Sequence, residues 1–162
     1  RKGAELLIKA YKALSYKNIK NDYELVMIGK DIEKFKNTYK DLDNCKFFGH
    51  LEGKSLLDHY ISSDILCSPA TENESFGIVL IEAMASKTAV LASNINGYNE
   101  IINNKNGLLF KNKDVNDLTN KLTLLIEDDN LRNNLKKTGY EFSKKYNWKK
   151  VSEGILKAYR NL

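Results

Sequence analysis

Several residue types that commonly build binding sites are scarce in this chain of 162 residues. It has one proline, two cysteines, two histidines, one tryptophan and three arginines. The cysteines form no Cys-x-x-Cys pair and the histidines lack the spacing of metal ligands, so the sequence predicts no bound metal ion. Because Cys45 and Cys67 each lie within a short apolar run, we expect buried thiols in a reducing compartment.

The shortage of arginine and the lack of long apolar runs argue against two further classes of protein. No apolar run approaches the ~20 residues that a transmembrane helix needs, and no signal peptide opens the chain. Sequence-specific nucleic-acid readers depend on arginine, so nucleic acid is not expected as a partner. The net charge of +5 comes from lysines scattered among asparagines, which is typical of a solvated surface and also compatible with an anionic membrane.

Two glycine-rich nucleotide motifs are absent as well. The chain has no Gly-x-Gly-x-x-Gly and no phosphate-loop lysine motif, which argues against dinucleotide oxidoreduction and nucleotide hydrolysis. Its composition is 42% hydrophobic and 29% charged, which is ordinary for a soluble globular protein. The length suggests one domain, spanning residues 1–162, with a substantial core.

Short apolar runs alternate with amphipathic segments along the chain. Strands are expected at residues 23–29, 45–49, 64–69, 88–93 and 107–110. Helices are expected at residues 4–14, 31–40, 55–62, 78–85, 115–127, 130–146 and 148–162, with a short helical turn at 97–102. This order predicts an α/β fold with a doubly wound parallel sheet, helices on both faces and additional C-terminal helices. Ligands of such sheets bind at the carboxyl ends of the strands.

Individual residues mark two of the expected helices. Asp114 is placed to cap the helix that begins at Val115. Trp148, Leu156 and Tyr159 lie at helical spacing near the end of the chain, and we expect them to be core or docking residues.

The stretch Glu74–Glu82 follows the third expected strand and a polar loop. It contains an acid, a small polar residue and a glycine, and then continues into an apolar helix. The first turn of a helix has unpaired N–H groups and a favourable dipole for anions, so this order predicts an anion site. Ser75 is expected to cap the turn, and Gly77 allows a ligand to approach the backbone.

The two glutamates of this stretch each have two interpretations. Glu82 is the only charged residue between Ile78 and Ala85, and it either faces solvent or accepts hydrogen bonds from the hydroxyls of a ribose. Glu74 either complements the helix dipole or faces a neutral or cationic part of a ligand, because a carboxylate would repel a pyrophosphate. A sugar ring meets that requirement.

Lys2 lies just before the first expected helix. A basic residue is unfavourable at a helix N-terminus unless an anion binds there. The alternative is an exposed lysine with no ligand.

The pattern Glu74-x7-Glu82, with Ser-Phe-Gly-Ile after the first acid and Glu-Ala-Met-Ala at the second, resembles the donor site of retaining GT-B glycosyltransferases. The likeness is greatest to the bacterial phosphatidylinositol mannosyltransferases. It continues through residues 89–93, 97–102, 106–109 and 146–148 and covers nearly the whole chain, as the C-terminal half of such an enzyme. The turn at Gly97 departs from the common Gly-Gly-x-Pro-Glu form.

This resemblance implies a Rossmann-like half of a GT-B fold that binds a UDP- or GDP-sugar and transfers its hexosyl group to an acceptor hydroxyl. No cofactor is implied. Glu74 would be catalytic, holding sugar hydroxyls and stabilising the electron-poor ring. The implied donor-binding residues are Lys2 at the diphosphate, Leu51 at the base, Glu82 at the ribose, and Ser75, Phe76, Gly77 and Ile78. The base is left open, because Glu52 is the only acid of the Leu51 loop.

The resemblance also implies missing parts. The chain opens with arginine, which suggests a fragment that lacks a first strand and an N-terminal acceptor domain and is inactive alone. The complete enzyme is expected in the cytoplasm, peripheral on the inner membrane face, with a lipid or glycan acceptor. Two alternatives are a non-catalytic GT-B scaffold or regulatory module and a GT-B sugar-nucleotide epimerase. Intact Glu74, Gly77 and Glu82 favour donor chemistry over a scaffold.

Overall fold

Helices and strands alternate in the computed structural model, which describes residues 2–17, 19, 22–40 and 42–160. All five expected strands are present, with slightly tighter bounds. The expected end of the last helix at Leu162 lies outside the described residues. The elements are α1 (Ala4–Leu14), β1 (Leu25–Ile28), α2 (Glu33–Thr38), β2 (Cys45–Phe48), α3 (Gly53–Ser62), β3 (Ile65–Ser68), α4 (Ile78–Ala85), β4 (Ala89–Ser93), β5 (Leu108–Phe110), α5 (Val115–Glu127), α6 (Asp129–Ser143), the 3-10 helix η1 (Lys144–Tyr146) and α7 (Trp148–Arg160).

Every strand pair is parallel, as expected. Leu25 of β1 is opposite Cys45 of β2, and the second group has the order β3-β4-β5. Among the described residues, the strands thus form a two-stranded and a three-stranded group, not one continuous hydrogen-bonded sheet.

Helices cover both faces of the strands. In β4, Ala89 and Leu91 pack into the cluster formed with α1 and α5. Val90 and Ala92 face the opposite way and pack into the cluster that contains Leu80, Ala83 and Met84 of α4. This alternation follows the period of two in a strand, and it leaves every residue of β4 buried. The prediction of a parallel sheet with helices on both faces is confirmed.

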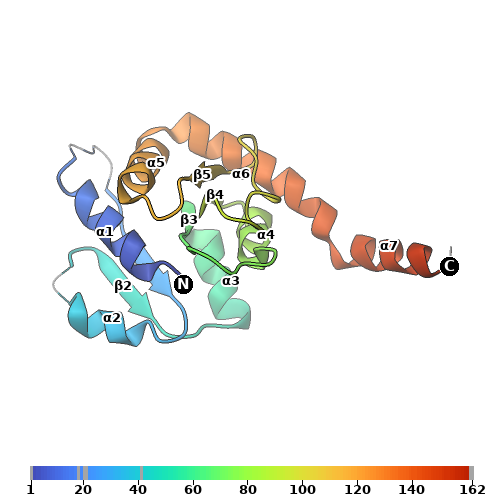
Figure 1. Cartoon of the computed structure of the whole chain (residues 1–162), viewed down its shortest axis with the longest axis horizontal. Coiled ribbons are helices and arrows are strands. Elements are labelled where there is room, and N and C mark those ends of the chain that lie inside the picture. Colours follow the sequence, from blue (N-terminus) through green and yellow to red (C-terminus); the bar gives the residue numbers. More distant parts are fainter. Residues whose placement is uncertain (1, 18, 20–21, 41, 161–162) are drawn as a thin grey trace.

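Helix α1 packs along both groups of strands. Leu7, Ala10 and Leu14 belong to the cluster that includes α5 and the inner residues of β4. Ile8 packs with Met27 of β1 and with Ile32, the N-cap residue of α2. Figure 1 shows α1 beside α5 at one side of the molecule and α3 and α4 at the other.

Two aspartates fix the starts of the C-terminal helices. The Asp114 carboxylate accepts a hydrogen bond from the Asp117 amide at 3.0 Å, so its expected role as the α5 cap is confirmed. The Asp128 carboxylate accepts one from the Leu131 amide at 2.8 Å and caps α6. Each bond satisfies an amide that the first helical turn leaves unpaired.

The expectation that the α7 residues belong to the core is wrong. Trp148 is 85% exposed, Leu156 54% and Tyr159 72%. Figure 1 shows the reason, since α7 extends away from the body of the molecule. Their interpretation as docking residues stays a prediction.

Cys45 and Cys67 are free thiols that are partly buried, not fully buried as expected. Burial is the main reason why the pKa of Cys45 rises to about 11 and that of Cys67 to about 12. None of the helices in the described part of the chain has the length and apolar character needed to cross a membrane.

Candidate functional site

Three segments that are distant in sequence meet beyond the carboxyl ends of β3 and β4. They are the N-terminus of α1, the loop between β3 and α4, and the turn that follows β4. The Ser93 hydroxyl, at the end of β4, donates a hydrogen bond to the carbonyl of Ala70 in the β3–α4 loop. This is the edge at which parallel α/β sheets bind ligands.

Two close backbone approaches hold these segments together. A Cβ added at Gly97 would overlap the carbonyl oxygen of Glu74, and one added at Gly3 would overlap the carbonyl oxygen of Pro69. Both glycines also have positive φ angles, 88° and 76°. Only glycine meets both conditions without strain, so the β3–α4 loop lies in direct contact with the Gly97 turn and with the start of α1.

Lys2 and Glu74 form an ion pair at this junction. The Lys2 side chain is 70% exposed, whereas the Glu74 side chain is only 14% exposed. The Glu74 loop, Leu51, Lys2 and the Gly97 loop are all predicted at or near strand ends, from which they could converge on one cleft. The structure brings Lys2, Glu74 and Gly97 together. A cation and a mostly buried carboxylate therefore lie together at the carboxyl edge of the sheet.

The expected cap of α4 is wrong. Gly77, not Ser75, is the N-cap residue, and its φ angle is 79°. Among the described residues no side chain caps this helix, and Ser75 lies exposed in the loop before it. A left-handed Gly77 turns the chain into the helix and carries Ser75 away from the first-turn amides. The start of α4, where the sequence predicts an anion site, thus has no side-chain cap.

Apolar side chains surround the start of α4. Phe76 is 39% exposed, Ile78 64% and Val79 39%. The Phe76 ring meets the Tyr146 ring edge-to-face at a centroid distance of 5.5 Å. Phe76 therefore joins the α4 N-terminus to η1, and Ile78 presents apolar surface to solvent.

The Tyr98 ring packs against Gly77. No pattern in the sequence indicated a role for this tyrosine. Two of its ring atoms lie 2.8 and 2.9 Å from the position of a Cβ added at Gly77, and the residue is 1% exposed. The Tyr98 hydroxyl and the Ser68 hydroxyl are 2.7 Å apart and share a hydrogen bond. Burial raises the pKa of Tyr98 and the nearby Glu74 carboxylate adds to the rise, while the Ser68 hydrogen bond opposes it.

Glu82 lies exposed on α4, where Tyr60 of α3 holds its carboxylate. The Tyr60 hydroxyl donates a hydrogen bond of 3.0 Å to Glu82 Oε2. Burial and then the Glu82 charge raise the pKa of Tyr60, so this hydroxyl stays protonated and remains a donor. Exposure agrees with the solvent-facing interpretation of Glu82, whereas a fixed orientation is what ribose binding requires. The ribose contact stays a prediction. Because Tyr60 and Glu82 are 22 residues apart, no local sequence pattern indicated that they form a pair.

Leu51 is partly buried in the connection from β2 to α3. The side chains of its neighbours His50 and Glu52 share a hydrogen bond of 2.7 Å between Nε2 and Oε1. Leu51 thus lies beyond the carboxyl end of β2, in the other group of strands from Glu74. Its contact with a nucleotide base stays a prediction.

Within the described part of the chain, no group of three or more His, Cys, Asp or Glu side chains is arranged to hold a metal ion. The Lys2 ammonium group and the N-terminus of α4 lie near Glu74.

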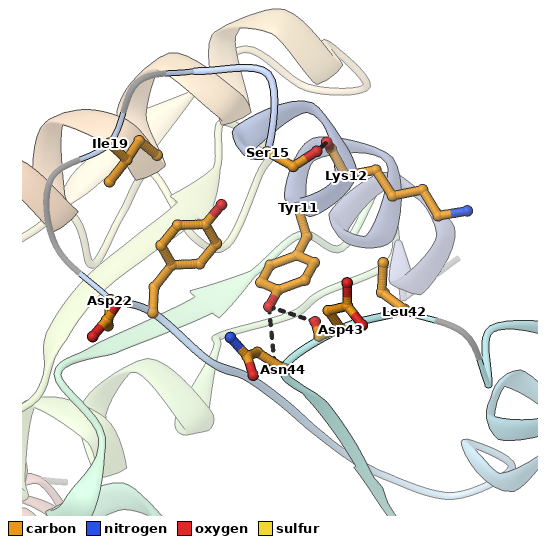
Figure 2. Close-up of a pocket in the computed structure, with 9 residues that line it drawn as sticks. Tyr11, Lys12, Ser15, Ile19, Asp22, Leu42, Asp43 and Asn44 are labelled. Atoms are coloured by element: carbon orange, nitrogen blue, oxygen red, sulfur yellow. Dashed lines mark hydrogen bonds between the residues drawn. The ribbon is translucent and has the colours of Figure 1, made fainter.

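The cavity in Figure 2 lies at the opposite edge of the strands. It has a volume of about 320 Å³, and Tyr23, just before β1, and Asn44, just before β2, contribute to its lining. The Tyr11 hydroxyl points into it and donates hydrogen bonds to the carbonyls of Asp43 and Asn44, at 3.0 and 2.9 Å. This cavity contains none of the expected site residues.

Residues 1–142 match the protein family described as Glycosyl transferases group 1. The chain belongs to this family. The family likeness that the Glu74–Glu82 stretch predicts is therefore confirmed.

Individual relatives agree with the family. The chain is 30% identical to a phosphatidyl-myo-inositol mannosyltransferase of Mycolicibacterium smegmatis, over 100% of this chain and 42% of that protein. The C-terminal domain of a glycosyl transferase group 1 family protein (LpcC) from Francisella tularensis superimposes with a TM-score of 0.76 and 31% identity, over 91% of this chain and 80% of that chain. The chain spans less than half the length of the curated relatives it matches.

A third likeness concerns the fold alone. HepE of Anabaena, crystallised in complex with UDP and glucose, superimposes with a TM-score of 0.83 and 20% identity. The match covers 99% of this chain and 45% of that chain. The C-terminal half of a GT-B glycosyltransferase is thus the architecture that the chain adopts.

Proposed function

We propose that this chain is the donor-binding half of a retaining glycosyltransferase that takes a nucleoside-diphosphate hexose without a metal ion. The observation that carries the proposal is the junction of Lys2, Glu74 and the start of α4, which has no side-chain cap. The diphosphate would lie against the first-turn amides of α4 and the Lys2 ammonium group. Glu74 would then face the sugar.

The catalytic contribution of this site is electrostatic. Negative charge builds up on the leaving diphosphate as the bond to the sugar breaks, and prepositioned N–H donors with Lys2 would stabilise it. Because Lys2 pairs with Glu74 in this structure, a bound diphosphate would compete with Glu74 for the ammonium group. The released carboxylate would accept hydrogen bonds from sugar hydroxyls and stabilise the electron-poor ring.

The nucleoside would extend from the diphosphate toward Glu82 and Leu51. Tyr60 holds the Glu82 carboxylate in a fixed direction, which lowers the entropy lost when it accepts two ribose hydroxyls. The UDP and glucose bound to HepE and the mannosyl transfer named for the Mycolicibacterium relative support a UDP- or GDP-hexose donor.

The acceptor would bind to an N-terminal domain of the complete protein. We propose a lipid-linked acceptor at the inner membrane face, because a mannosyltransferase of phosphatidylinositol is among the relatives and the net charge of +5 favours an anionic surface. Co-sedimentation of the complete protein with anionic and neutral vesicles checks this. Equally negligible binding to both would favour a soluble acceptor.

Calorimetry on the complete polypeptide tests the donor site with UDP, GDP, UDP-glucose and GDP-mannose, each with and without a chelator. Glu82→Gln is expected to weaken nucleotide binding about tenfold or more, since a hydrogen bond to a charged group contributes ~1.5–3 kcal/mol. Glu74→Gln should spare UDP binding and remove the added affinity from the sugar. Glu127→Gln at the end of α5 removes the same charge far from the site and should bind as wild type.

The outcomes separate the alternatives. Unchanged UDP and GDP affinities in Glu82→Gln would establish the solvent-facing interpretation of that residue. Strict dependence on magnesium or manganese would overturn the metal-free site. Failure to bind any nucleotide would favour a non-catalytic scaffold, and conversion of a sugar nucleotide without an acceptor would favour an epimerase.

A further inference from the structure

The loop between β3 and α4 has no regular secondary structure, and side chains from the ends of two other strands hold its backbone. The Ser93 hydroxyl, at the end of β4, donates a hydrogen bond to the Ala70 carbonyl. The next carbonyl of the loop, that of Thr71, accepts a hydrogen bond of 3.0 Å from the side-chain nitrogen of Asn112, just after β5. Two neighbouring carbonyls of the loop are thus held from β4 and β5.

Asn112 lies in a turn that is itself well fixed. Phe110, at the end of β5, is fully buried. The Lys111 amide donates a hydrogen bond of 2.6 Å to the Asp117 carboxylate, and the Asp114 amide donates one of 3.0 Å to the Lys111 carbonyl. Asp114 also caps α5. A buried strand on one side and a capped helix on the other therefore give Asn112 a fixed position relative to the sheet.

The bond to Thr71 lies three residues before Glu74. Between them Asn73 has a φ angle of 58°, in the left-handed region that residues other than glycine seldom adopt. After this turn the Glu74 carbonyl lies against Gly97, where an added Cβ would overlap it. The left-handed turn is therefore held on both sides, by Asn112 before it and by Gly97 after it. The direction of the Glu74 carboxylate depends on that turn.

The hydrogen bonding of the Asn112 carboxamide is incomplete. Its nitrogen donates to Thr71, whereas its oxygen is buried with no hydrogen-bond partner among the described residues. A buried acceptor without a partner costs free energy, which offsets what a single neutral hydrogen bond contributes to stability. We therefore expect this side chain to affect the position of the loop more than the stability of the fold.

We propose that Asn112 is a positioning residue of the donor site. It fixes the Thr71 carbonyl, and through it the direction of the Glu74 carboxylate toward the sugar. Asn112 acts from the turn after β5, two strands away from β3, without touching the donor. This role rests on the proposed function, in which Glu74 faces the sugar.

Calorimetry on the complete polypeptide with UDP, UDP-glucose, GDP and GDP-mannose tests this role. Asn112→Ala removes the donor to Thr71 without adding charge. We expect it to bind UDP and GDP as wild type and to lose about fivefold of the added affinity that the sugar supplies, the effect of one neutral hydrogen bond. Asn116→Ala removes the same carboxamide from an exposed position in the first turn of α5 and should bind as wild type.

A double-mutant cycle separates positioning from a merely structural effect. If Asn112 acts through Glu74, Asn112→Ala causes no further loss of sugar-nucleotide affinity once Glu74→Gln is present. The same loss in both backgrounds would overturn the proposal, and so would an unchanged sugar affinity in Asn112→Ala. The urea midpoints of Asn112→Ala and Asn116→Ala should be similar. A loss of sugar affinity accompanied by a clearly lower midpoint would also overturn the positioning role.

A measurement without donor distinguishes failure of this role from failure of the proposed function. NMR relaxation of the nucleotide-free polypeptide gives the order parameters of the Glu72 and Asn73 amides. In Asn112→Ala both should fall from about 0.85, typical of rigid backbone, toward the flexible range below about 0.6, and in Asn116→Ala they should not change.

Unchanged order parameters in Asn112→Ala would overturn the idea that this side chain holds the loop. Absence of sugar-nucleotide binding in the wild type would overturn the proposed function, and with it the role of Asn112 at the donor. A fall in the order parameters would then still support the contact between Asn112 and the loop.

Discussion

Lys2 and Glu74 are 72 residues apart in sequence but form an ion pair in the folded chain. Their pairing depends on glycines that allow the backbones of three segments to touch. The pair also gives each residue a partner when no ligand is present, which limits the electrostatic cost of a carboxylate that is only 14% exposed. The charges of the site are therefore stabilised before any donor arrives.

Replacement of Gly97 tests this backbone contact. In Gly97→Ala the new Cβ overlaps the Glu74 carbonyl oxygen and the φ of 88° is strained, so we expect a loss of about 2 kcal/mol or more in the free energy of unfolding. Gly53→Ala is the control, because Gly53 also has a positive φ, of 56°, but nothing lies within 4 Å of its added Cβ. Urea unfolding of both variants provides the measurement. Equal losses would show that the contact with Glu74 contributes nothing beyond backbone strain.

At the scale of whole elements, local signals predicted the helices and strands well. Asp114 lies directly before an amphipathic run, and its carboxylate caps α5 as expected. The capping signal failed at Ser75, because Gly77 adopts the left-handed turn that sets the start of α4. Spacing also suggested a core role for Trp148, which the exposed position of α7 contradicts. Periodicity identifies an apolar face but not the surface that covers it.

The site was predictable only in part for a related reason. Ligands of parallel sheets bind at the carboxyl edge, and this rule correctly indicated that Lys2 and Glu74 could lie close together. Neither the Tyr60–Glu82 hydrogen bond nor the packing of Tyr98 against Gly77 has any counterpart in local sequence. Contacts of this kind arise when helices pack on a sheet, and a single sequence contains no direct record of them.

The cap of α6 offers a prediction at the same scale. Asp128→Ala removes the carboxylate that accepts from the Leu131 amide, and we expect a loss of about 1 kcal/mol in the free energy of unfolding. Asp128→Asn should retain most of the stability because its amide oxygen also accepts. Asn130→Ala, on an exposed position of α6, serves as the reference in urea titrations followed by circular dichroism. A loss as small as that of the reference would mean that the cap is dispensable.

For the molecule as a whole, the two thiols predict a loss of stability in alkali. Folding raises the pKa of Cys45 to about 11 and that of Cys67 to about 12, from an ordinary value of 9.0. Between pH 9 and these values the unfolded chain releases protons that the folded chain retains. Stability from this source is therefore present below pH 9 and declines as the pH rises toward 11 and 12.

Urea midpoints at pH 8 and pH 11 check this dependence. The wild-type midpoint is expected to fall at the higher pH. The doubly substituted Cys45→Ala/Cys67→Ala chain should be less stable at pH 8 but should lose less between the two pH values. The same decline in both proteins would assign the alkaline effect to other groups, of which Tyr11, with its pKa raised to about 12, is the first to examine.

The exposed position of Trp148 determines what intrinsic fluorescence can report. Trp148 is the single tryptophan of the chain, and at 85% exposure its indole already emits in an aqueous environment when the chain is folded. Unfolding of the core should therefore change the emission wavelength very little, whereas near-ultraviolet dichroism of buried rings such as Tyr98 should change strongly. Any surface that covers α7 would shift the emission to shorter wavelengths, so the chain contains a built-in probe for contacts at that helix.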